Sequence, residues 1–236
     1  MKAVFVFAHP DDECVYSAGV IAKLTNSGVT VKLITATKGE AGQTGNPPLC
    51  KQEELGMVRE QELRNAANVL GISDIYFLGY MDGTLNQIPQ REISRRIQKI
   101  LEKEKPDIVV TFNKEGGSRH PDHIYMSMCT TNAFMAYIKD GKQQARLYYA
   151  EVPKHLLKAL EKQGTMYTAF GKIQGTPDQE ITTIIDITET MDTKIKAFQC
   201  HKTQEQDWQI YVKNKDLPEF HFEYFRLIWE NGFFLV

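Results

Sequence analysis

The stretch KAVFVFAHPDDECV, residues 2–15, joins an apolar run to a cluster of ionisable side chains. Its first half is an apolar run rich in valine and phenylalanine, which predicts a buried strand. Directly after this run the chain places His9 and three carboxylates, Asp11, Asp12 and Glu13. Like charges at this density repel one another unless something positive is bound among them. The stretch therefore predicts a strand that ends in a cluster in need of a cation.

The same strand-then-helix pattern continues along the chain as far as about residue 150. Apolar runs, most of them apolar on both faces, predict strands at residues 2–8, 29–37, 74–79, 106–112 and 145–152. Stretches with helical spacing lie between them, at residues 12–28, 53–71, 90–106 and 121–141. This alternation predicts an α/β fold, a doubly wound (Rossmann-like), mostly parallel sheet flanked by helices, with its site at the carboxyl ends of the strands.

Beyond residue 150 the pattern is less regular. Residues 181–188 predict a strand, and residues 189–212 predict a helix or a pair of helices. In residues 219–229 the alternation breaks at Tyr224–Phe225, so a strand with a bulge or a bend is possible there. We interpret this aromatic tail as a covering element or a subunit contact, which makes a homo-oligomer plausible. We predict one domain over residues 1–236, of which 150–236 is the less regular C-terminal part.

Composition excludes several classes of protein. The formal net charge of −2 gives no reason to expect nucleic acid as a partner. The four cysteines lie far apart without a CxxC pair, which favours reduced thiols over a zinc ribbon or a disulfide framework. No apolar run approaches the roughly 18 residues that a membrane span requires. We therefore predict a soluble, cytoplasmic protein.

The loop at residues 38–54 is long, rich in glycine and proline, and follows the second predicted strand. Loops in this position are where open α/β sheets bind ligands. Its glycines do not form GxGxxG, and no stretch of the chain matches GxxxxGK[ST]. A nucleotide-binding protein without a metal therefore remains the least favoured class.

The tripeptide His-Pro-Asp occurs twice, at residues 9–11 and 120–122. Each copy follows a predicted strand and opens a predicted helix, and proline is well tolerated at the first helical position. Residues three apart share a helix face, which pairs His9 with Asp12 and His120 with His123. If the two strands end at the same edge of the sheet, these four side chains converge.

Imidazole and carboxylate donors together suit zinc, with iron(II) or cobalt as substitutes. Four protein ligands would make a closed, structural site, whereas three ligands and a water would make a catalytic one. The sequence offers four candidate ligands and one further carboxylate, Asp11, beside Asp12. A catalytic site needs a base near the metal, and a structural site does not need Asp11. Either motif alone is typical of a capped helix or a surface pair, but the two together favour a metal site.

AHPDDE at residues 8–13 and HPDH at residues 120–123 resemble the motifs of the LmbE-like, or PIG-L, family of zinc-dependent N-deacetylases. The resemblance covers most of the chain. Weaker similarities follow in the expected order: TKGEAG (37–42), REQELRNAANVLG (59–71), YMDGTL (80–85) and AFQCHKTQ (197–204).

The resemblance implies one zinc ion per chain, or another divalent metal, with His9, Asp12 and His123 as ligands. Asp11 would be the general base. His120 would polarise the carbonyl or protonate the leaving amine, and Asp122 would orient His120.

The resemblance also implies contacts with substrate hydroxyls or a polar head group. The residues concerned are Arg59, Asp82, Ser118, Arg119 and His201. Many relatives have Tyr-Gly before the second motif, where this chain has Ser118-Arg119. A tyrosine able to steady the oxyanion is then missing unless Arg119 or another residue replaces it.

Other conspicuous residues receive ordinary interpretations. Glu13 and Glu40 are interpreted as caps of a helix and a loop, and His155 and His221 as surface or core residues. For His201, packing and the rim of the site are equally favoured.

The function that this pattern predicts is a zinc-dependent hydrolase that removes the N-acetyl group from an N-acetylglucosamine-type amino sugar or its conjugate. The partner would be a small molecule. The alternatives are a zinc amidase acting on a non-sugar or thiol-conjugate amide, and a zinc-binding α/β protein without catalysis.

Overall fold

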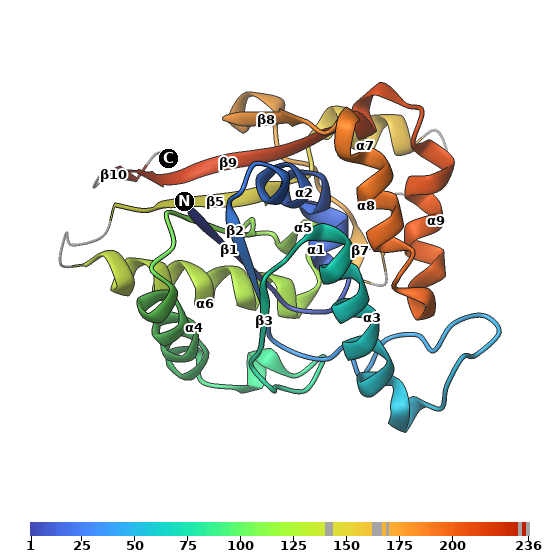
Figure 1. The fold of residues 1–236 in the computed structure, drawn as a ribbon, viewed down its shortest axis with the longest axis horizontal. Helices are drawn as coiled ribbons and strands as arrows, with labels where there is room; N and C mark the ends of the chain where they lie inside the picture. Colours follow the sequence, from blue (N-terminus) through green and yellow to red (C-terminus); the bar gives the residue numbers. More distant parts are fainter. Residues whose placement is uncertain (140–143, 162–166, 169, 231–232, 235–236) are drawn as a thin grey trace.

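The computed structural model describes residues 1–139, 144–161, 167–168, 170–230 and 233–234. Its centre is an eight-stranded sheet in the order β10-β9-β5-β4-β1-β2-β3, with β8 paired to β9 (Figure 1). The strands of this sheet are β1 (Lys2–Phe7), β2 (Thr30–Thr35), β3 (Asp74–Phe77), β4 (Ile108–Phe112), β5 (Arg146–Glu151), β8 (Thr183–Asp186), β9 (Phe222–Glu230) and β10 (Phe233–Phe234). A separate two-stranded ribbon joins β6 (Tyr167–Thr168) and β7 (Gly171–Lys172).

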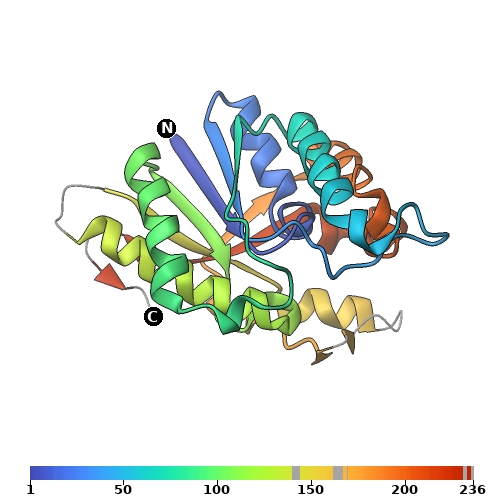
Figure 2. The same cartoon turned by 90° about the horizontal axis from the view of Figure 1, so that it is seen from below.

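Helices cover both faces of the sheet (Figures 1 and 2). Helices α2, α3 and α8 contact one another on one side, and α4 packs against α6 on the other. The α-helices are α1 (Asp12–Tyr16), α2 (Ala18–Asn26), α3 (Leu55–Leu70), α4 (Gln90–Glu104), α5 (Gly116–Arg119), α6 (Pro121–Ile138), α7 (Lys154–Glu161), α8 (Met191–Phe198) and α9 (Glu205–Asn214). The short 3₁₀ helices are η1 (Gln52–Glu54), η2 (Leu85–Gln87), η3 (Asp178–Glu180), η4 (Thr188–Thr190), η5 (Lys202–Gln204) and η6 (Pro218–His221).

The strand order places the two His-Pro-Asp motifs next to each other. Strand β1 pairs in parallel with both β2 and β4, with Ala3 opposite Ile108 and Phe5 opposite Val110. The chain winds outward from β1 through β2 to β3, and then returns to β4 and β5 on the other side. The carboxyl ends of β1 and β4 therefore mark the topological switch point of the sheet, where open α/β sheets bind their ligands. The predicted doubly wound, mostly parallel sheet is confirmed.

Burial explains why these residues form these elements. Residues 3–7 of β1 are all buried, as a central parallel strand covered on both faces requires. In α4, Ile93, Ile97 and Leu101 are fully buried and lie four residues apart, so they form the apolar stripe by which α4 joins the core.

Two expectations about the first motif were wrong. The predicted helix at residues 12–28 is broken at Ser17 into α1 and α2. Pro10 does not begin α1, because the N-cap is Asp11 in a left-handed conformation with φ 106°. In the second motif the expectation is confirmed, since His120 is the N-cap of α6 and Pro121 is its first residue.

The C-terminal part contributes strands β8 and β9 to the same sheet and helix α8 to the helix layer. Helices α8 and α9 confirm the predicted pair. The aromatic tail is strand β9, not a covering element, and its register against β5 shifts between Leu227 and Trp229, not at Tyr224–Phe225. The end of the predicted helix 121–141 lies partly outside the described residues, and α6 ends at Ile138. None of the helices described is long and apolar enough to cross a membrane.

Candidate metal centre and active site

The side chains of the two His-Pro-Asp motifs meet at the carboxyl edge of the sheet. The ring centroid of His9 lies 4.7 Å from that of His120 and 5.1 Å from that of His123. His9 follows β1, whereas His120 and His123 follow β4, so the adjacency of these strands produces the cluster. The predicted convergence of the motifs is confirmed.

Three side chains in this cluster bring donor atoms as close together as a small cation requires. His9 Nδ1 lies 3.1 Å from His123 Nε2. Asp12 Oδ1 lies 3.2 Å from His123 Nε2, and Asp12 Oδ2 lies 3.6 Å from His9 Nδ1. Tetrahedral zinc with bonds near 2.0–2.1 Å holds its ligand atoms about 3.3 Å apart. His9, Asp12 and His123 therefore fit zinc, and His120 lies close enough to His9 and His123 to be an alternative donor.

Hydrogen bonds on the far side of each ring fix which nitrogen faces the centre. His123 Nδ1 donates to the carbonyl of Gly116 at 3.0 Å, which leaves a lone pair on Nε2. His9 Nε2 lies 2.9 Å from Asp82 Oδ1, so Nδ1 faces the centre and offers a lone pair in the neutral ring. Burial opposes the charged form, but hydrogen bonds to the carboxylates around the ring outweigh it and raise the pKa of His9 well above its usual range. Such partners are typical of histidines that bind metals. Two ring lone pairs that face each other call for a proton or a cation between them.

Asp12 is held in the same geometry by the backbone. Its Oδ2 accepts hydrogen bonds from the N–H groups of His9, at 2.7 Å, and Ala8, at 3.2 Å. Burial disfavours the ionised form, but the His123 and His9 rings outweigh it and hold the pKa of Asp12 well below its usual range. Asp12 is therefore a carboxylate, the form that binds metals.

Asp11 faces away from these backbone donors and pairs with an arginine. Its Oδ2 lies 2.9 Å from Arg59 Nη2, and Arg59 also donates to the carbonyls of Pro10 and Gly39. Burial raises the pKa of Asp11 to about 7, although the charge of Arg59 opposes this shift.

The glycines of the TKGEAG segment make room for Arg59. A Cβ atom at Gly39 would lie 2.3 Å from Arg59 Nη1, and one at Gly42 would lie 2.4 Å from it. The loop after β2 therefore wraps around the guanidinium group that holds Asp11.

The structure assigns Asp122 different contacts from those predicted. Its carboxylate accepts hydrogen bonds from the N–H groups of Gly83, at 2.7 Å, and Leu85, at 3.2 Å, and lies 3.4 Å from His9 Nε2. It meets His120 through its backbone N–H, which donates to His120 Nδ1 at 3.1 Å. Asp122 therefore contacts His120 through its backbone, while its carboxylate is engaged by the loop after β3 and by His9, and its role in orienting His120 stays a prediction.

The hydrogen bond from the Asp122 backbone N–H determines which nitrogen of the neutral His120 ring carries the proton. Because Nδ1 accepts a hydrogen bond, the neutral ring carries its proton on Nε2. Burial and the neighbouring His9 and His123 rings lower the pKa of His120 to about 4. His120 is thus a neutral ring at the side of the cluster, and its Nε2–H can donate a hydrogen bond.

Three of the five predicted substrate contacts are buried in this structure. Arg59 is 3% exposed, Asp82 is 9% exposed and His201 is 0% exposed. Arg59 and Asp82 are occupied with Asp11 and His9 instead of facing open space. His201 cannot reach substrate, so the packing alternative for this residue holds.

The other two predicted substrate contacts, Ser118 and Arg119, lie closer to the surface. Ser118 is half-buried, with its Oγ 3.2 Å from His123 Nδ1. Arg119 is exposed and has a left-handed backbone with φ 67°. Of the five, Arg119 keeps the side chain that is freest to meet a ligand.

The remaining interpretations have mixed outcomes. Glu40 caps the loop as predicted, since it accepts from the N–H groups of Lys38 and Asp82. Glu13 is fully buried and pairs with His201. His155 bonds Asp178 and Tyr224, and His221 bonds the carbonyl of Lys215.

Sequence reasoning missed two aromatic walls of the site. Phe112 stacks on the His123 ring at 4.2 Å and 9°. Its place as the last residue of the strand before the second motif could have identified it. Phe170 contacts the His120 ring edge-to-face at 4.4 Å, and no local pattern marks this residue.

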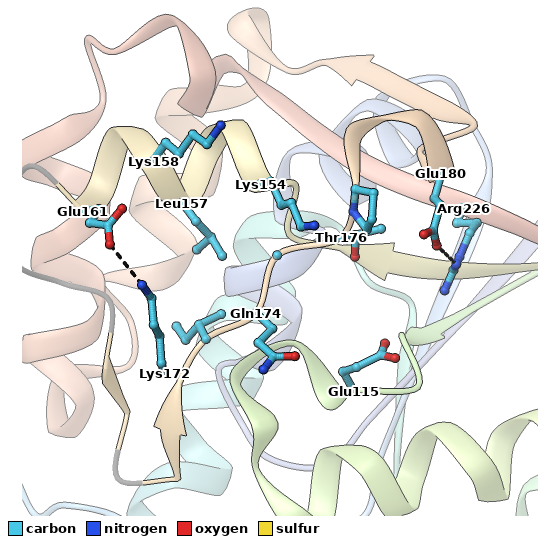
Figure 3. Close-up of a pocket in the computed structure, with 13 residues that line it drawn as sticks. Glu115, Lys154, Leu157, Lys158, Glu161, Lys172, Gln174, Thr176, Glu180 and Arg226 are labelled. Carbon is cyan, nitrogen blue, oxygen red and sulfur yellow. Dashed lines mark hydrogen bonds and ion pairs between the residues drawn. The ribbon is translucent and has the colours of Figure 1, made fainter.

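A cavity of about 570 Å³ lies between α7 and the segment 172–177 (Figure 3). Glu115 lines it and directly precedes Gly116, whose carbonyl holds His123. Lys154 and Lys172 also line it, and Lys172 pairs with Glu161. None of its lining residues belongs to the His-Pro-Asp motifs, so the cavity does not contain the cluster.

The fold and the cluster together define an α/β protein with a histidine–carboxylate centre at its switch point. The profile of the PIG-L family, described as GlcNAc-PI de-N-acetylase, matches residues 4–134. The chain belongs to the PIG-L family, as its sequence motifs predict.

Two curated relatives illustrate the family. The 1D-myo-inositol 2-acetamido-2-deoxy-alpha-D-glucopyranoside deacetylase of Kineococcus radiotolerans is 30% identical over 249 residues, covering 86% of this chain and 68% of that protein. The probable N-acetyl-alpha-D-glucosaminyl L-malate deacetylase 2 of Bacillus anthracis is 42% identical over 141 residues, covering 59% of this chain and 62% of that protein.

Solved structures show the same fold at lower identity. N,N'-diacetylchitobiose deacetylase from Pyrococcus horikoshii matches with a TM-score of 0.66 and 24% identity, over 96% of this chain and 83% of that one. GalB, the 4-carboxy-2-hydroxymuconate hydratase of Pseudomonas putida KT2440, matches with a TM-score of 0.70 and 19% identity, over 100% and 99%. Because one fold carries both a deacetylase and a hydratase, the reaction has to be argued from the site.

Proposed function

We propose that this chain is a metal-dependent hydrolase that removes the N-acetyl group from an N-acetylglucosamine-type amino sugar or its conjugate. The observation that carries the proposal is the spacing of His9 Nδ1, His123 Nε2 and the Asp12 carboxylate, with Asp11 beside them. N-deacetylation as the reaction class is confirmed at the level of the family, since the curated relatives are deacetylases of N-acetylglucosamine conjugates.

His9, Asp12 and His123 would hold the metal, for which zinc is the first candidate because its donor set combines imidazole and carboxylate. When bound there, zinc supplies a Lewis acid for the amide oxygen and lowers the pKa of water towards about 7. Three protein ligands leave a position open, as a catalytic site requires.

The chain's own residues then move the protons. Asp11, held by Arg59, takes a proton from the attacking water as the water oxygen bonds to the acetyl carbon. His120 presents Nε2–H, which donates to the developing oxyanion or to the nitrogen of the leaving amine. The C–N bond breaks, and acetate and the primary amine leave.

The remainder of the substrate is proposed only as a class. The two curated relatives act on conjugates in which the sugar is joined to inositol or to malate. The cavity lined by Glu115 offers a polar space, and exposed Arg119 ends the short helix α5 that follows Glu115. We propose that a polar aglycone lies on this side of the site.

A cytoplasmic location, a homo-oligomer and a single domain over residues 1–236 stay predictions. The alternatives in function are a metal amidase for another amide and a metal-binding protein without catalysis. Asp11 argues against the second, because a structural centre has no use for a carboxylate beside its ligands.

The direct test is the release of primary amine by zinc-loaded protein, across N-acetylglucosamine joined to inositol, to malate and to a second sugar. Amine and acetate in equal amounts from at least one conjugate are expected. Zinc bound stoichiometrically with no amine from any conjugate would contradict the proposed substrate class.

A further inference from the structure

The turn that carries Asp11 is held from two sides. Asp11 has φ 106° and ψ −25°, a conformation that a residue with a side chain keeps only when its surroundings enforce it. Arg59 Nη2 lies 2.9 Å from its carboxylate. On the backbone side, the N–H of Asp11 donates to Glu13 Oε2 at 3.0 Å. The direction of the Asp11 side chain therefore depends on Glu13 as well as on Arg59.

Glu13 is itself held by a residue from the other end of the chain. Its carboxylate is 0% exposed, and a buried carboxylate is tolerated only when it is paired. The other oxygen, Oε1, accepts from His201 Nε2 at 2.8 Å and from Cys14 Sγ at 3.1 Å. His201 is 188 residues away in sequence and is also 0% exposed.

Among the described residues, the His201 ring makes its hydrogen bond with Glu13. Its Nδ1 is buried and has no hydrogen-bond partner among the described residues. Nε2 carries a proton in the imidazolium and also in the neutral tautomer that leaves Nδ1 bare. In either state the ring donates to Glu13, so the link does not depend on titration.

We propose that Glu13 and His201 form a buried pair that positions Asp11, acting through the Asp11 backbone N–H. Neither residue reaches substrate, so both are positioning residues. The proposal rests on the proposed function, because it takes Asp11 as the base. It explains why a glutamate follows the two aspartates and gives the buried late histidine a role beyond packing.

A matched pair of substitutions separates the hydrogen bond from packing. Glu13→Met fills a similar volume without an acceptor, whereas Glu13→Gln keeps an oxygen for the Asp11 N–H. In the zinc-loaded full chain we expect Glu13→Met to lower kcat at least about tenfold with KM and zinc content unchanged. Glu13→Gln should recover kcat to within about threefold of the wild type, because it restores the hydrogen bond. Glu102→Met, at an exposed position of α4, makes the same substitution away from the site and serves as the control, with kcat near that of the wild type.

Two further measurements show whether the effect passes through Asp11. In an Asp11→Asn background, Glu13→Met should cause no further loss of kcat, because residues that act as a unit are not additive. The Asp11 amide proton, followed by ¹⁵N NMR of the zinc-loaded protein, should exchange slowly in the wild type and in Glu13→Gln, and faster in Glu13→Met. His201→Leu tests the same link from its other end and should reproduce the Glu13→Met pattern more weakly.

Three results would each contradict the proposed role of the pair. The first is a wild-type kcat in Glu13→Met, and the second is a loss of kcat from Glu13→Met that is as large in the Asp11→Asn background as in the wild type. The third is an Asp11 amide proton that exchanges at the same rate in all variants. A loss of zinc from Glu13→Met together with the loss of kcat would show that the pair acts on the metal ligand Asp12. That result would contradict a role through Asp11. The amide measurement needs no substrate, so it decides the proposal even where the wild type releases no amine and the proposed function fails.

Discussion

His9 Nδ1 lies 3.1 Å from His123 Nε2, and each ring makes a further hydrogen bond on its opposite side. The carboxylate of Asp82 accepts from His9 Nε2, and the carbonyl of Gly116 accepts from His123 Nδ1. The two inward nitrogens are thereby turned toward each other beside the Asp12 carboxylate. This relationship makes the carboxyl ends of β1 and β4 a candidate metal centre.

Asp82 is expected to act on the metal and not on the substrate. Asp82→Asn removes the carboxylate that orients His9, and loss of such a partner lowers metal affinity about 10–100-fold. Competition with a chelator measures the zinc affinity, and Asp74→Asn, an exposed aspartate paired with Lys32, is the control. A raised KM with unchanged zinc affinity would instead support the substrate contact that the sequence predicts.

Asp11→Asn should keep the metal and lose the reaction. Asparagine preserves the size of the side chain but cannot accept the proton of the attacking water. We expect kcat to fall by about 10² or more with zinc still bound in equal amount. Asp192→Asn, at an exposed position of α8, should retain full activity. A zinc-loaded Asp11→Asn protein with undiminished turnover would refute the assignment of the base.

Arg59 is expected to matter for stability as well as for turnover. It is almost fully buried and donates to Asp11, Pro10 and Gly39. Arg59→Met leaves the Asp11 carboxylate buried without its partner, which should lower the free energy of unfolding by about 3–5 kcal/mol. Arg64→Met removes an exposed ion pair with Glu60 on the same helix and should cost less than about 1 kcal/mol. Equal urea midpoints for the two variants would contradict this account.

Glu104, the last residue of α4, is expected to make a pH-dependent contribution to stability. Hydrogen bonds from Tyr76 and Lys32 hold its pKa below the usual range against the cost of burial. A carboxyl whose pKa is lowered by folding stabilises the protein above its unfolded pKa of about 4.3, and this contribution is lost as the pH falls through the folded pKa.

Glu104→Gln should therefore lower the free energy of unfolding by about 1 kcal/mol at pH 7, with a smaller difference from the wild type below about pH 4. Urea unfolding at several pH values measures it, with the exposed Glu102→Gln as the control. A difference that grows as the pH falls would have the wrong sign for this cause.

The sequence predicts the centre of this site better than its surroundings. The apolar strands and the helices between them mark β1, β4 and their helices, and the doubled His-Pro-Asp motif marks the four converging side chains. These features are local, with periods and spacings that a single chain displays. The left-handed turn at Asp11 is not, because it depends on a hydrogen bond to Glu13 and an ion pair with Arg59.

Contacts between distant parts of the chain were beyond the sequence patterns. The fully buried pair of Glu13 and His201 joins residues at opposite ends of the chain. The wall that Phe170 forms against His120 is equally unmarked. The contact of the Asp122 carboxylate with the backbone N–H of Gly83 is unmarked as well, because it joins the second motif to the loop after β3.

Metal dependence is tested most directly by a zinc titration of metal-free protein, with the initial rate of amine release from an N-acetylglucosamine conjugate as the readout. We predict no release without metal, a linear rise with added zinc, and a plateau at one zinc per chain. Release that is indifferent to zinc and chelator, or a plateau at zero with one zinc bound, would contradict a metal-dependent N-deacetylase built on His9, Asp12 and His123.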